Sequence, residues 1–489
     1  MEEVKSWLHI TWQYTYITLI IGYYALVIWA VIKLLLENKN PLKTHSYLLA
    51  LILIPVLGLL IYILFGQDYR RNKLFSRKAA IDQARINEYA EAQLKLASEH
   101  ELIEDKEIRQ RANMIKLLLS NNHSFLSKNN KITLLFNGEQ KFPELIKCLK
   151  QAKDHIHVEY YIFDEDQIGN EIAEVLAGKA KEGVTVRFIY DDVGTSHIHK
   201  SYKKLFDRAG VEYYPFMPVY IPKLSRANYR DHRKIVVIDG KVGFVGGMNV
   251  ADRYINKNGK ITWRDTHLKI EGDAVNSLQI IFMLNWYFVS KKRLQFSENY
   301  FPVHQAGNQC VQIAASGPDS DWASIMQAFF VAISNAKSQV LITTPYFIPN
   351  EPILTALSTA ALGGVDVQII FPYKGDNKIV QAASMSYMKE VLEAGVKVHL
   401  YTGGFNHSKT MVVDGMISSV GTANMDFRSF DQNFEVNAFI YNRSIANQLI
   451  ERFNEDKKQC LPLLLSRWQQ RPIRRRLAES SSRLLAPLL

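Results

Sequence analysis

Cysteine is scarce in this chain of 489 residues, and its three copies are scattered at Cys148, Cys310 and Cys460. The scattering and the lack of any CxxC spacing argue against both a disulfide framework and a thiolate zinc site. The pattern favours reduced structural thiols in a domain that faces the cytosol.

Acidic residues are outnumbered: 48 Asp and Glu stand against 59 Lys and Arg, which gives a formal net charge of +11. This balance favours anionic partners such as nucleic acid, acidic lipid surfaces or phosphorylated substrates. Glycine and proline, with 25 and 15 copies, and a hydrophobic content of 47% exclude a collagen-like or disordered chain. The mean hydropathy of −0.11 by itself indicates a soluble protein.

Two long hydrophobic runs near the start of the chain oppose that average. Residues 10–32 and 46–67 contain no charged side chain. Each is long enough to cross a hydrocarbon core of ~30 Å, which takes about 20 helical residues. They predict a transmembrane hairpin over residues 1–70 with spans at about 10–33 and 46–67, and a pair of buried core helices is the alternative.

Basic residues after the second run set the expected orientation. Five of them follow within a short stretch: Arg70, Arg71, Lys73, Arg77 and Lys78. Because positively charged flanks stay in the cytoplasm, we expect both termini and the rest of the chain on the cytoplasmic side. The same cluster also suits anionic headgroups, at about 1 kcal/mol per charge.

A pattern of helices and apolar strands occurs twice after a polar, helix-prone connector at residues 71–130. Gly183, between a helix and a strand in the first copy, matches Gly364 in the second. The strands are β-branched and aromatic with little alternation, which is typical of strands buried between helix layers. We predict a duplicated α/β unit whose homologous halves, residues 131–310 and 311–489, share a site where they meet.

Each half ends with the same short motif, HRKIVVIDGKVGFVGGMN in the first and HSKTMVVDGMISSVGTAN in the second. The recurring residues are His232, Lys234, Asp239 and Asn249, and then His407, Lys409, Asp414 and Asn424. A lone His-x-Lys is usually part of a surface strand, but duplication at identical spacing predicts a functional role. Because the His and Lys lie two positions apart beside a strand, both side chains point to one face.

These residue types suit phosphate chemistry. Two histidines, two lysines and two asparagines form a cationic pocket of donors for a phosphate that gains charge in the transition state. One imidazole can attack phosphorus to form a phosphohistidine, and the other can protonate the leaving alcohol. Acidic side chains must orient the rings: the candidates are Asp265, 33 residues after His232, and Glu435, 28 residues after His407. No metal or other cofactor is required, because the lysines supply the positive charge.

The repeated H-x-K-x4-D motif resembles that of the phospholipase D superfamily from about residue 130 to the end. The closer similarity is to bacterial cardiolipin synthases of the membrane-anchored, two-motif type. It is carried by GLLIYILFG at the hairpin's end, TPYFIP, WRDTHLKIEGDAV, GTANMDFRSF and NFEVN. The resemblance implies a pseudo-two-fold α/β/α sandwich with one active site, held as a multi-pass protein in the bacterial inner membrane. It also implies condensation of two phosphatidylglycerol molecules into cardiolipin and glycerol.

The resemblance also assigns roles to residues. Catalytic roles pass to His232, Lys234 and Asp239 and to His407, Lys409 and Asp414, and phosphate binding passes to Asn249 and Asn424. The two aspartates are expected to pin the turn beyond each strand without touching substrate. We assign His232 as the nucleophile and His407 as the general acid, and the reverse stays open. The chain departs from the usual pattern at Asp231, where an asparagine is commoner, and at Asn406; Asp231 could shift the basicity of its neighbour.

Other functions use the same residues. A hydrolytic phospholipase D would pass the phosphatidyl group to water, a superfamily nuclease would use the positive charge for nucleic acid, and a non-catalytic membrane scaffold is a further alternative. The resemblance implies phosphatidylglycerol as the substrate, and the hairpin favours an anionic membrane as a partner over nucleic acid; the oligomeric state is not indicated. Residues 213–230 suit a lipid-contacting loop or a packed surface loop. The basic C-terminal tail suits an amphipathic membrane helix or a helix packed on the catalytic domain.

Overall fold

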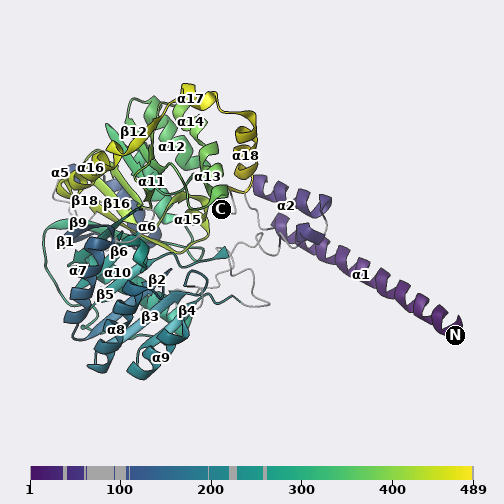
Figure 1. Ribbon diagram of the computed structural model, residues 1–489, viewed down its shortest axis with the longest axis horizontal. Helices are drawn as coiled ribbons and strands as arrows, with labels where there is room; N and C mark the ends of the chain where they lie inside the picture. Colours follow the sequence, from purple (N-terminus) through teal and green to yellow (C-terminus); the bar gives the residue numbers. More distant parts are fainter. Residues whose placement is uncertain are drawn as a thin grey trace. The chain divides into compact units, whose positions relative to one another are not determined.

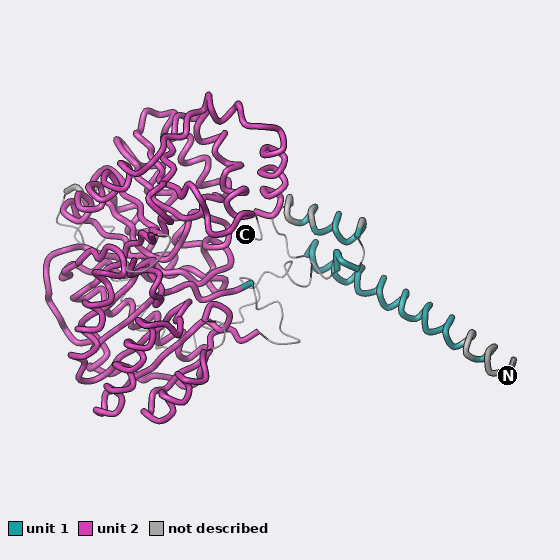
Figure 2. Tube along the Cα trace, in the orientation of Figure 1, with its two compact units in different colours: residues 1–69, 221–228 teal, residues 70–220, 229–489 magenta. Residues whose placement is uncertain are grey.

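The computed structural model describes residues 2–36, 41–54, 56–59, 62, 93, 106–109, 111–195, 198–219, 228–256 and 262–486. The chain divides into two compact units (Figure 2). The first comprises residues 1–69 and 221–228, and the second residues 70–220 and 229–489. The first unit contains the N-terminal helices, and the second contains both copies of the repeat.

The first unit begins with a long apolar helix, α1 (Glu2–Leu36). Its segment Thr11–Leu36 is long and apolar enough to cross a membrane, and it is the one such helix in the described part of the chain. The next helix, α2 (Pro41–Leu53), has 13 residues and is too short to cross by itself. It ends ahead of Pro55, since proline disfavours helical geometry at the preceding residue. The described residues thus hold one helix of spanning length where the sequence predicts two.

Parts of two other predicted features lie outside the described residues. In the second predicted span, most of residues 60–67 lie outside. In the predicted connector, most residues before 106 lie outside, as does the basic cluster that begins at Arg70. Residues 220–227 of the predicted loop 213–230 are outside as well.

The second unit is built on one mixed sheet that runs through both halves (Figure 1). The first half supplies β1 (Ser127–Phe136), β2 (His155–Tyr160), β3 (Thr185–Asp191), β4 (Glu212–Phe216), β5 (Lys234–Ile238), β6 (Val242–Gly246) and β8 (Thr266–Glu271). The second half supplies β9 (Gln309–Ser316), β10 (Gln339–Thr343), β12 (Asp366–Pro372), β13 (Lys397–Tyr401), β15 (Thr410–Val413), β16 (Ile417–Gly421), β18 (Glu435–Tyr441) and β19 (Cys460–Leu463). Among the described residues these 15 strands have the order β19-β13-β12-β10-β15-β16-β18-β9-β1-β8-β6-β5-β2-β3-β4.

The strand order is the same in both directions from the centre of the sheet. β1 and β9 pair antiparallel there, with Ser127 opposite Val311. Outward from β1 follow β8, β6, β5, β2, β3 and β4, and outward from β9 follow their counterparts β18, β16, β15, β10, β12 and β13. The parallel pairs β2–β3 and β10–β12 also correspond. The predicted duplicated α/β architecture is confirmed.

Helices cover both faces of this sheet. The first half has α7 (Asn137–Gln151), α8 (Gln167–Lys181), α9 (Lys200–Ala209) and α10 (Ala274–Ser290), and the second has α11 (Ser324–Ser334), α12 (Glu351–Leu362), α13 (Lys378–Ser386), α14 (Met388–Glu393) and α16 (Arg443–Lys458). In β5, Val236 and Ile238 pack beneath α7 to α9, whereas Ile235 and Val237 share a core with α10 and α16. Strand residues therefore alternate between two apolar layers, as an α/β/α sandwich requires.

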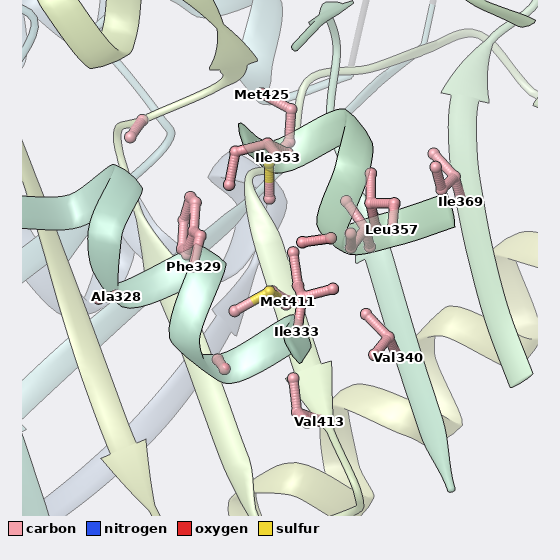
Figure 3. Packing of buried hydrophobic residues seen from close by; sticks show 14 of the residues in the cluster. Ala328, Phe329, Ile333, Val340, Ile353, Leu357, Ile369, Met411, Val413 and Met425 are labelled. Atoms are coloured by element: carbon pink, nitrogen blue, oxygen red, sulfur yellow. The ribbon is translucent and has the colours of Figure 1, made fainter. Parts of the chain in front are cut away.

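The outer layer of the second half shows this packing at close range. Figure 3 shows Phe329 and Ile333 of α11 and Ile353 and Leu357 of α12 pointing toward strand residues such as Met411. Helix α6 (Ala112–Asn122), preceded by the single turn α5 (Lys106–Arg109), joins the same core through its apolar side. The end of the predicted connector is therefore part of the globular core of the second half.

Several short elements complete the second unit. They are η3 (Asp252–Tyr254), β7 (Trp263–Arg264), β11 (Phe347–Ile348), β14 (Phe405–Asn406), β17 (Met425–Asp426) and α15 (Phe427–Asp431). The chain ends with α17 (Leu465–Gln469) and α18 (Ile473–Arg483).

The two motif aspartates fix turns at the far end of β5 and β15 from the histidines. Both have a positive φ of 51°. Asp239 accepts hydrogen bonds from the backbone N–H groups of residues 153–155, and Asp414 from those of residues 337–339. Asp414 also pairs with Arg111 ahead of α6. Each carboxylate thus ties the end of one strand to the start of the adjacent strand.

We predict that Asp414→Ala destabilises the second unit without touching the substrate site. A carboxylate bound by several amide donors contributes about 2–3 kcal/mol, and its loss removes the hydrogen bonds that tie the end of β15 to the start of β10. Burial raises the pKa of Asp414, but the amides and Arg111 outweigh burial and lower it. Its contribution is therefore present above the ordinary aspartate pKa and is lost as the pH falls through the lowered value.

The measurement is the urea midpoint of the full chain in detergent at neutral and acidic pH. The matched control is the exposed Asp321→Ala. Equal midpoints for the two variants at neutral pH would contradict the turn-fixing role.

Candidate active site

The two His-x-Lys pairs lie at the start of corresponding strands, β5 and β15. His232 precedes β5 and Lys234 is its first residue, while His407 and Lys409 both lie just before β15. Both lysines are buried, and their Nζ atoms donate to the carbonyl oxygens of His232 and His407 respectively. Each lysine is thereby fixed beside its own histidine.

The histidines are held by carboxylates from the opposite halves. His232 Nδ1 lies 3.0 Å from both Oε1 and Oε2 of Glu435, and His407 Nδ1 lies 2.7 Å from Oδ2 of Asp265. Both carboxylates are fully buried. Because an ionised carboxylate only accepts hydrogen bonds, Nδ1 carries the proton and Nε2 is left to reach a substrate.

Backbone hydrogen bonds repeat this exchange between halves. His232 N–H donates to Phe434 O at 2.9 Å, and His407 N–H donates to Arg264 O at 2.7 Å. In each case the acceptor is the residue just before the orienting carboxylate. β14 also pairs with β7 in parallel, which holds the His407 segment against the first half.

The pairing that the sequence suggests is therefore wrong, and the orienting role of both carboxylates stays a prediction. The sequence suggests Asp265 for His232 and Glu435 for His407, each within its own half. The structure exchanges them, because β8 and β18 begin where the halves meet. Gly247 leaves room for the Asp265 carboxylate, since a Cβ there would collide with Oδ1.

Burial sets the protonation of the four basic groups. It lowers the pKa of His232 to about 4, against the opposing charge of Glu435, and that of His407 to about 3, helped by Lys409. It also lowers the pKa of Lys234 to about 7 and that of Lys409 to about 8. Lys409 contributes to the lowering at His232, so groups of both halves act within one site. The imidazoles are therefore neutral and nucleophilic at neutral pH. The two lysines beside them have pKa values close to neutral pH, so a small change in their surroundings alters their charge.

The two motif asparagines follow β6 and β16 and are both buried. Asn249 accepts from Ile162 N–H and donates to the Tyr254 hydroxyl, which leaves one of its two amide hydrogens for another acceptor. Asn424 is buried close to Asp426. Their predicted contact with a phosphate stays a prediction.

Aromatic rings also line the site, with more of them near His407 than near His232. None of them is among the residues predicted from the sequence. The rings of Trp263, Phe405 and Tyr254 lie 5.4, 5.8 and 6.0 Å from that of His407. Tyr161 stands edge-on to His232 at 5.1 Å, and Lys234 Nζ lies 5.3 Å from the centre of the Tyr161 ring. The rings keep the imidazoles dry, which strengthens every electrostatic contact nearby.

A buried acid pair lies behind His232. Asp231 and Glu159 are fully buried, and burial, followed by their mutual repulsion, raises the pKa of Asp231 well above the usual range. The raised pKa favours the neutral form of Asp231, which resembles the asparagine expected from the superfamily pattern. The expected effect of Asp231 on the basicity of His232 stays a prediction. The charged Glu159 within the apolar strand HVEYYIF is the signal that could have revealed the pair.

Lys141 is another buried base that the sequence analysis does not single out. It is 0% exposed, and its Nζ donates to the carbonyl oxygens of Met248 and Asn249 at 2.9 and 3.2 Å. It also lies over the rings of Phe142 and Tyr160. Lys141 thus supports the backbone that presents Asn249.

No cluster of three or more His, Cys, Asp or Glu side chains with metal-binding geometry is found among the residues that the structure describes. The positive charge of the site comes from Lys234 and Lys409.

Comparisons with known proteins agree with this geometry. A family model described as "Cardiolipin synthase, PLD-like domain" matches residues 145–278 and 329–457, and a "Phospholipase_D-nuclease N-terminal" model matches residues 25–67. The chain is 45% identical over 460 residues to "Cardiolipin synthase" of Geobacillus sp. (strain WCH70), covering 93% of this chain and 90% of the relative. It is 44% identical over 467 residues to that of Geobacillus kaustophilus, covering 95% and 92%.

The chain belongs to the cardiolipin synthase family. Family membership makes it a phosphatidyltransferase of the phospholipase D type that acts on phospholipid. Among solved structures it is similar to phosphatidylserine synthase of Haemophilus influenzae Rd KW20, with a TM-score of 0.59 over 77% of this chain and 100% of that one. At 14% identity this likeness concerns the fold alone.

We predict that Glu435→Gln and Asp265→Asn each lower cardiolipin synthase activity by about 10²- to 10⁴-fold, because the wrong tautomer then points at the substrate. The measurement is the initial rate of lipid transfer by folded, full-length variants. The matched control is Glu451→Gln, an exposed residue of α16. Activities of the Glu435 and Asp265 variants close to that of the control would contradict the orienting role.

Proposed function

We propose that the chain condenses two phosphatidylglycerol molecules into cardiolipin and glycerol through a phosphohistidine. The observation that supports this most is the exchange of orienting carboxylates, which occupy Nδ1 of both imidazoles and leave Nε2 of each ring for a substrate in one buried site with two lysines. Double-displacement chemistry needs such a pair: one group that bonds to phosphorus and one that moves protons.

In the first step Nε2 of His232 attacks phosphorus of the first phosphatidylglycerol. The bond from phosphorus to the headgroup glycerol oxygen breaks, and His407 gives that oxygen a proton. The bound phosphodiester makes this protonation possible, because an added negative charge raises the pKa of the His407 ring. Lys234 and Lys409 neutralise charge on the non-bridging oxygens as it grows.

In the second step the glycerol hydroxyl of another phosphatidylglycerol attacks the phosphohistidine. His407, now neutral, takes the hydroxyl proton, and the phosphorus–nitrogen bond to His232 breaks. Cardiolipin leaves, and both histidines return to their starting states. Attack by water would instead release phosphatidic acid, which is the product of the alternative, a hydrolytic phospholipase D.

We further propose that the chain is a multi-pass protein of the bacterial inner membrane with a cytoplasmic catalytic unit. The spanning-length helix in α1, the uncharged run at residues 46–67 and the N-terminal family match over residues 25–67 support the anchor. The basic cluster after residue 69 supports the cytoplasmic side. In this arrangement residues 1–70 form the hairpin, 71–130 the connector, and 131–310 and 311–489 the halves.

The test supplies phosphatidylglycerol to the purified full chain in mixed micelles and resolves the lipid products. Cardiolipin with an equal amount of glycerol is expected. Phosphatidic acid as the main product would overturn the transferase proposal in favour of hydrolysis.

We predict that His232→Ala abolishes the covalent phosphatidyl adduct, whereas His407→Ala allows it to form and accumulate. The adduct is followed with acyl-labelled phosphatidylglycerol after alkaline quenching, since a nitrogen–phosphorus bond is sensitive to acid. An adduct that survives in His232→Ala and disappears in His407→Ala would reverse the two roles. The parent protein supplies the reference amount.

We predict that the KM for phosphatidylglycerol rises as the pH passes through 7 to 8. Lys234 and Lys409, with pKa values of about 7 and 8, are protonated below this range and lose their charge above it. Free enzyme then loses its attraction for the anionic headgroup, whereas a bound anion keeps both lysines protonated and leaves kcat less affected. A KM that stays flat from about pH 6 to about pH 9 would contradict the assignment.

A further inference from the structure

The last helix, α18, turns its charged side toward the protein. Glu479 is only 3% exposed and pairs with Arg471 at 2.7 Å and with Arg475 at 3.0 Å. At the other end of the helix, Arg483 pairs with Glu390 of α14 at 2.7 Å and lies over the Tyr387 ring. Figure 1 shows α18 at the margin of the catalytic unit, beside α13.

The opposite side of the same helix is apolar and exposed. Ile473, Leu477 and Leu484 are 62%, 60% and 82% exposed. Their spacing of four and seven residues places them in one stripe along the helix. A surface helix of a soluble domain normally has the reverse arrangement, with its apolar stripe against the core.

Basic side chains flank the stripe. Arg474 and Arg476 are exposed, and neither forms an ion pair within the described part of the chain. The acidic residue of α18, Glu479, faces inward. The outer surface of α18 therefore combines apolar side chains with positive charge and lacks negative charge.

The orientation of the helix is fixed by its contacts, so the stripe cannot rotate inward without breaking them. The Arg471 guanidinium stacks on the buried Trp468 of α17 at 3.8 Å and also binds Glu479. Rotation would expose the buried Glu479 and break its pairs with Arg471 and Arg475.

We propose that α18 is an interfacial anchor that rests on the surface of an anionic phospholipid bilayer. Ile473, Leu477 and Leu484 enter the boundary between headgroups and acyl chains, and Arg474 and Arg476 bind lipid phosphates. Charge complementarity favours this partner, since apolar residues with flanking arginines are the composition of helices that lie in anionic interfaces. The segment Thr11–Leu36 of the same chain is long and apolar enough to cross a membrane, so a bilayer is an available partner for this chain. The sequence suggests either a membrane helix or a helix packed on the domain for the C-terminal tail. In this proposal α18 is both: its polar side packs on the domain and its apolar side contacts lipid.

The experiment reconstitutes the full chain into vesicles of phosphatidylcholine alone or with phosphatidylglycerol and follows backbone hydrogen–deuterium exchange. Exchange over residues 473–485 is expected to slow in the phosphatidylglycerol vesicles, while that of α16, the internal reference, stays unchanged. The double variants Ile473→Ser/Leu477→Ser and Arg474→Gln/Arg476→Gln should each lose the slowing. Leu362→Ser, an exposed leucine at the end of α12, is the matched control and should keep it.

Several outcomes would overturn the anchor. Equal exchange of α18 in both vesicle types would remove the anionic bilayer as the partner. Slowing in detergent that grows with protein concentration would show instead that the stripe joins two copies of the chain. Slowing that is lost in Leu362→Ser, or shared by α16, would indicate a general change in stability. The readout is independent of activity, so it stands or falls separately from the proposed chemistry.

Discussion

The exchange of carboxylates between the halves is the constraint on which the rest of the site depends. A buried imidazole needs a fixed acceptor at Nδ1, or its other nitrogen has no defined direction or proton. His232 receives that acceptor from Glu435 and His407 receives it from Asp265. Neither half alone can therefore orient its histidine, because the carboxylate that accepts from Nδ1 belongs to the other half. Both halves must be folded and docked before either ring is oriented.

The sandwich makes this exchange possible. A continuous sheet with β1 and β9 at its centre brings the starts of β8 and β18 to the motif segments of the opposite halves. The motif aspartates act at the other ends of β5 and β15, where they bind strand-start amides. In each motif the histidine and lysine lie at the start of a strand, in the site, and the aspartate lies at the other end, where it fixes a turn. The motif residues therefore keep the same spacing in both halves although their roles differ.

Burial of this site also shapes its electrostatics. Dry surroundings lower the pKa values of the histidines and lysines until a neighbouring negative charge restores them. The carboxylates therefore also raise the pKa values of the groups beside them, in addition to orienting the rings. A bound phosphodiester, which is an anion, raises these pKa values further. The excess of positive charge over the whole chain has a second use at the surface, where α18 presents arginines beside an apolar stripe.

The sequence alone determined the family and the duplication, because fixed spacing and apolar strand patterns can be read directly along the chain. The same spacing predicts the motif histidines and lysines and both orienting acids as site residues. Tertiary structure decided which acid serves which histidine, since the docking of the halves is not encoded in separation along the chain. It also decided that the pKa of Asp231 is raised, because burial and then the nearby Glu159 carboxylate disfavour its charged form. Finally, it decided which side of α18 packs on the domain, because the pair of Arg483 with Glu390 of α14 fixes the rotation of the helix.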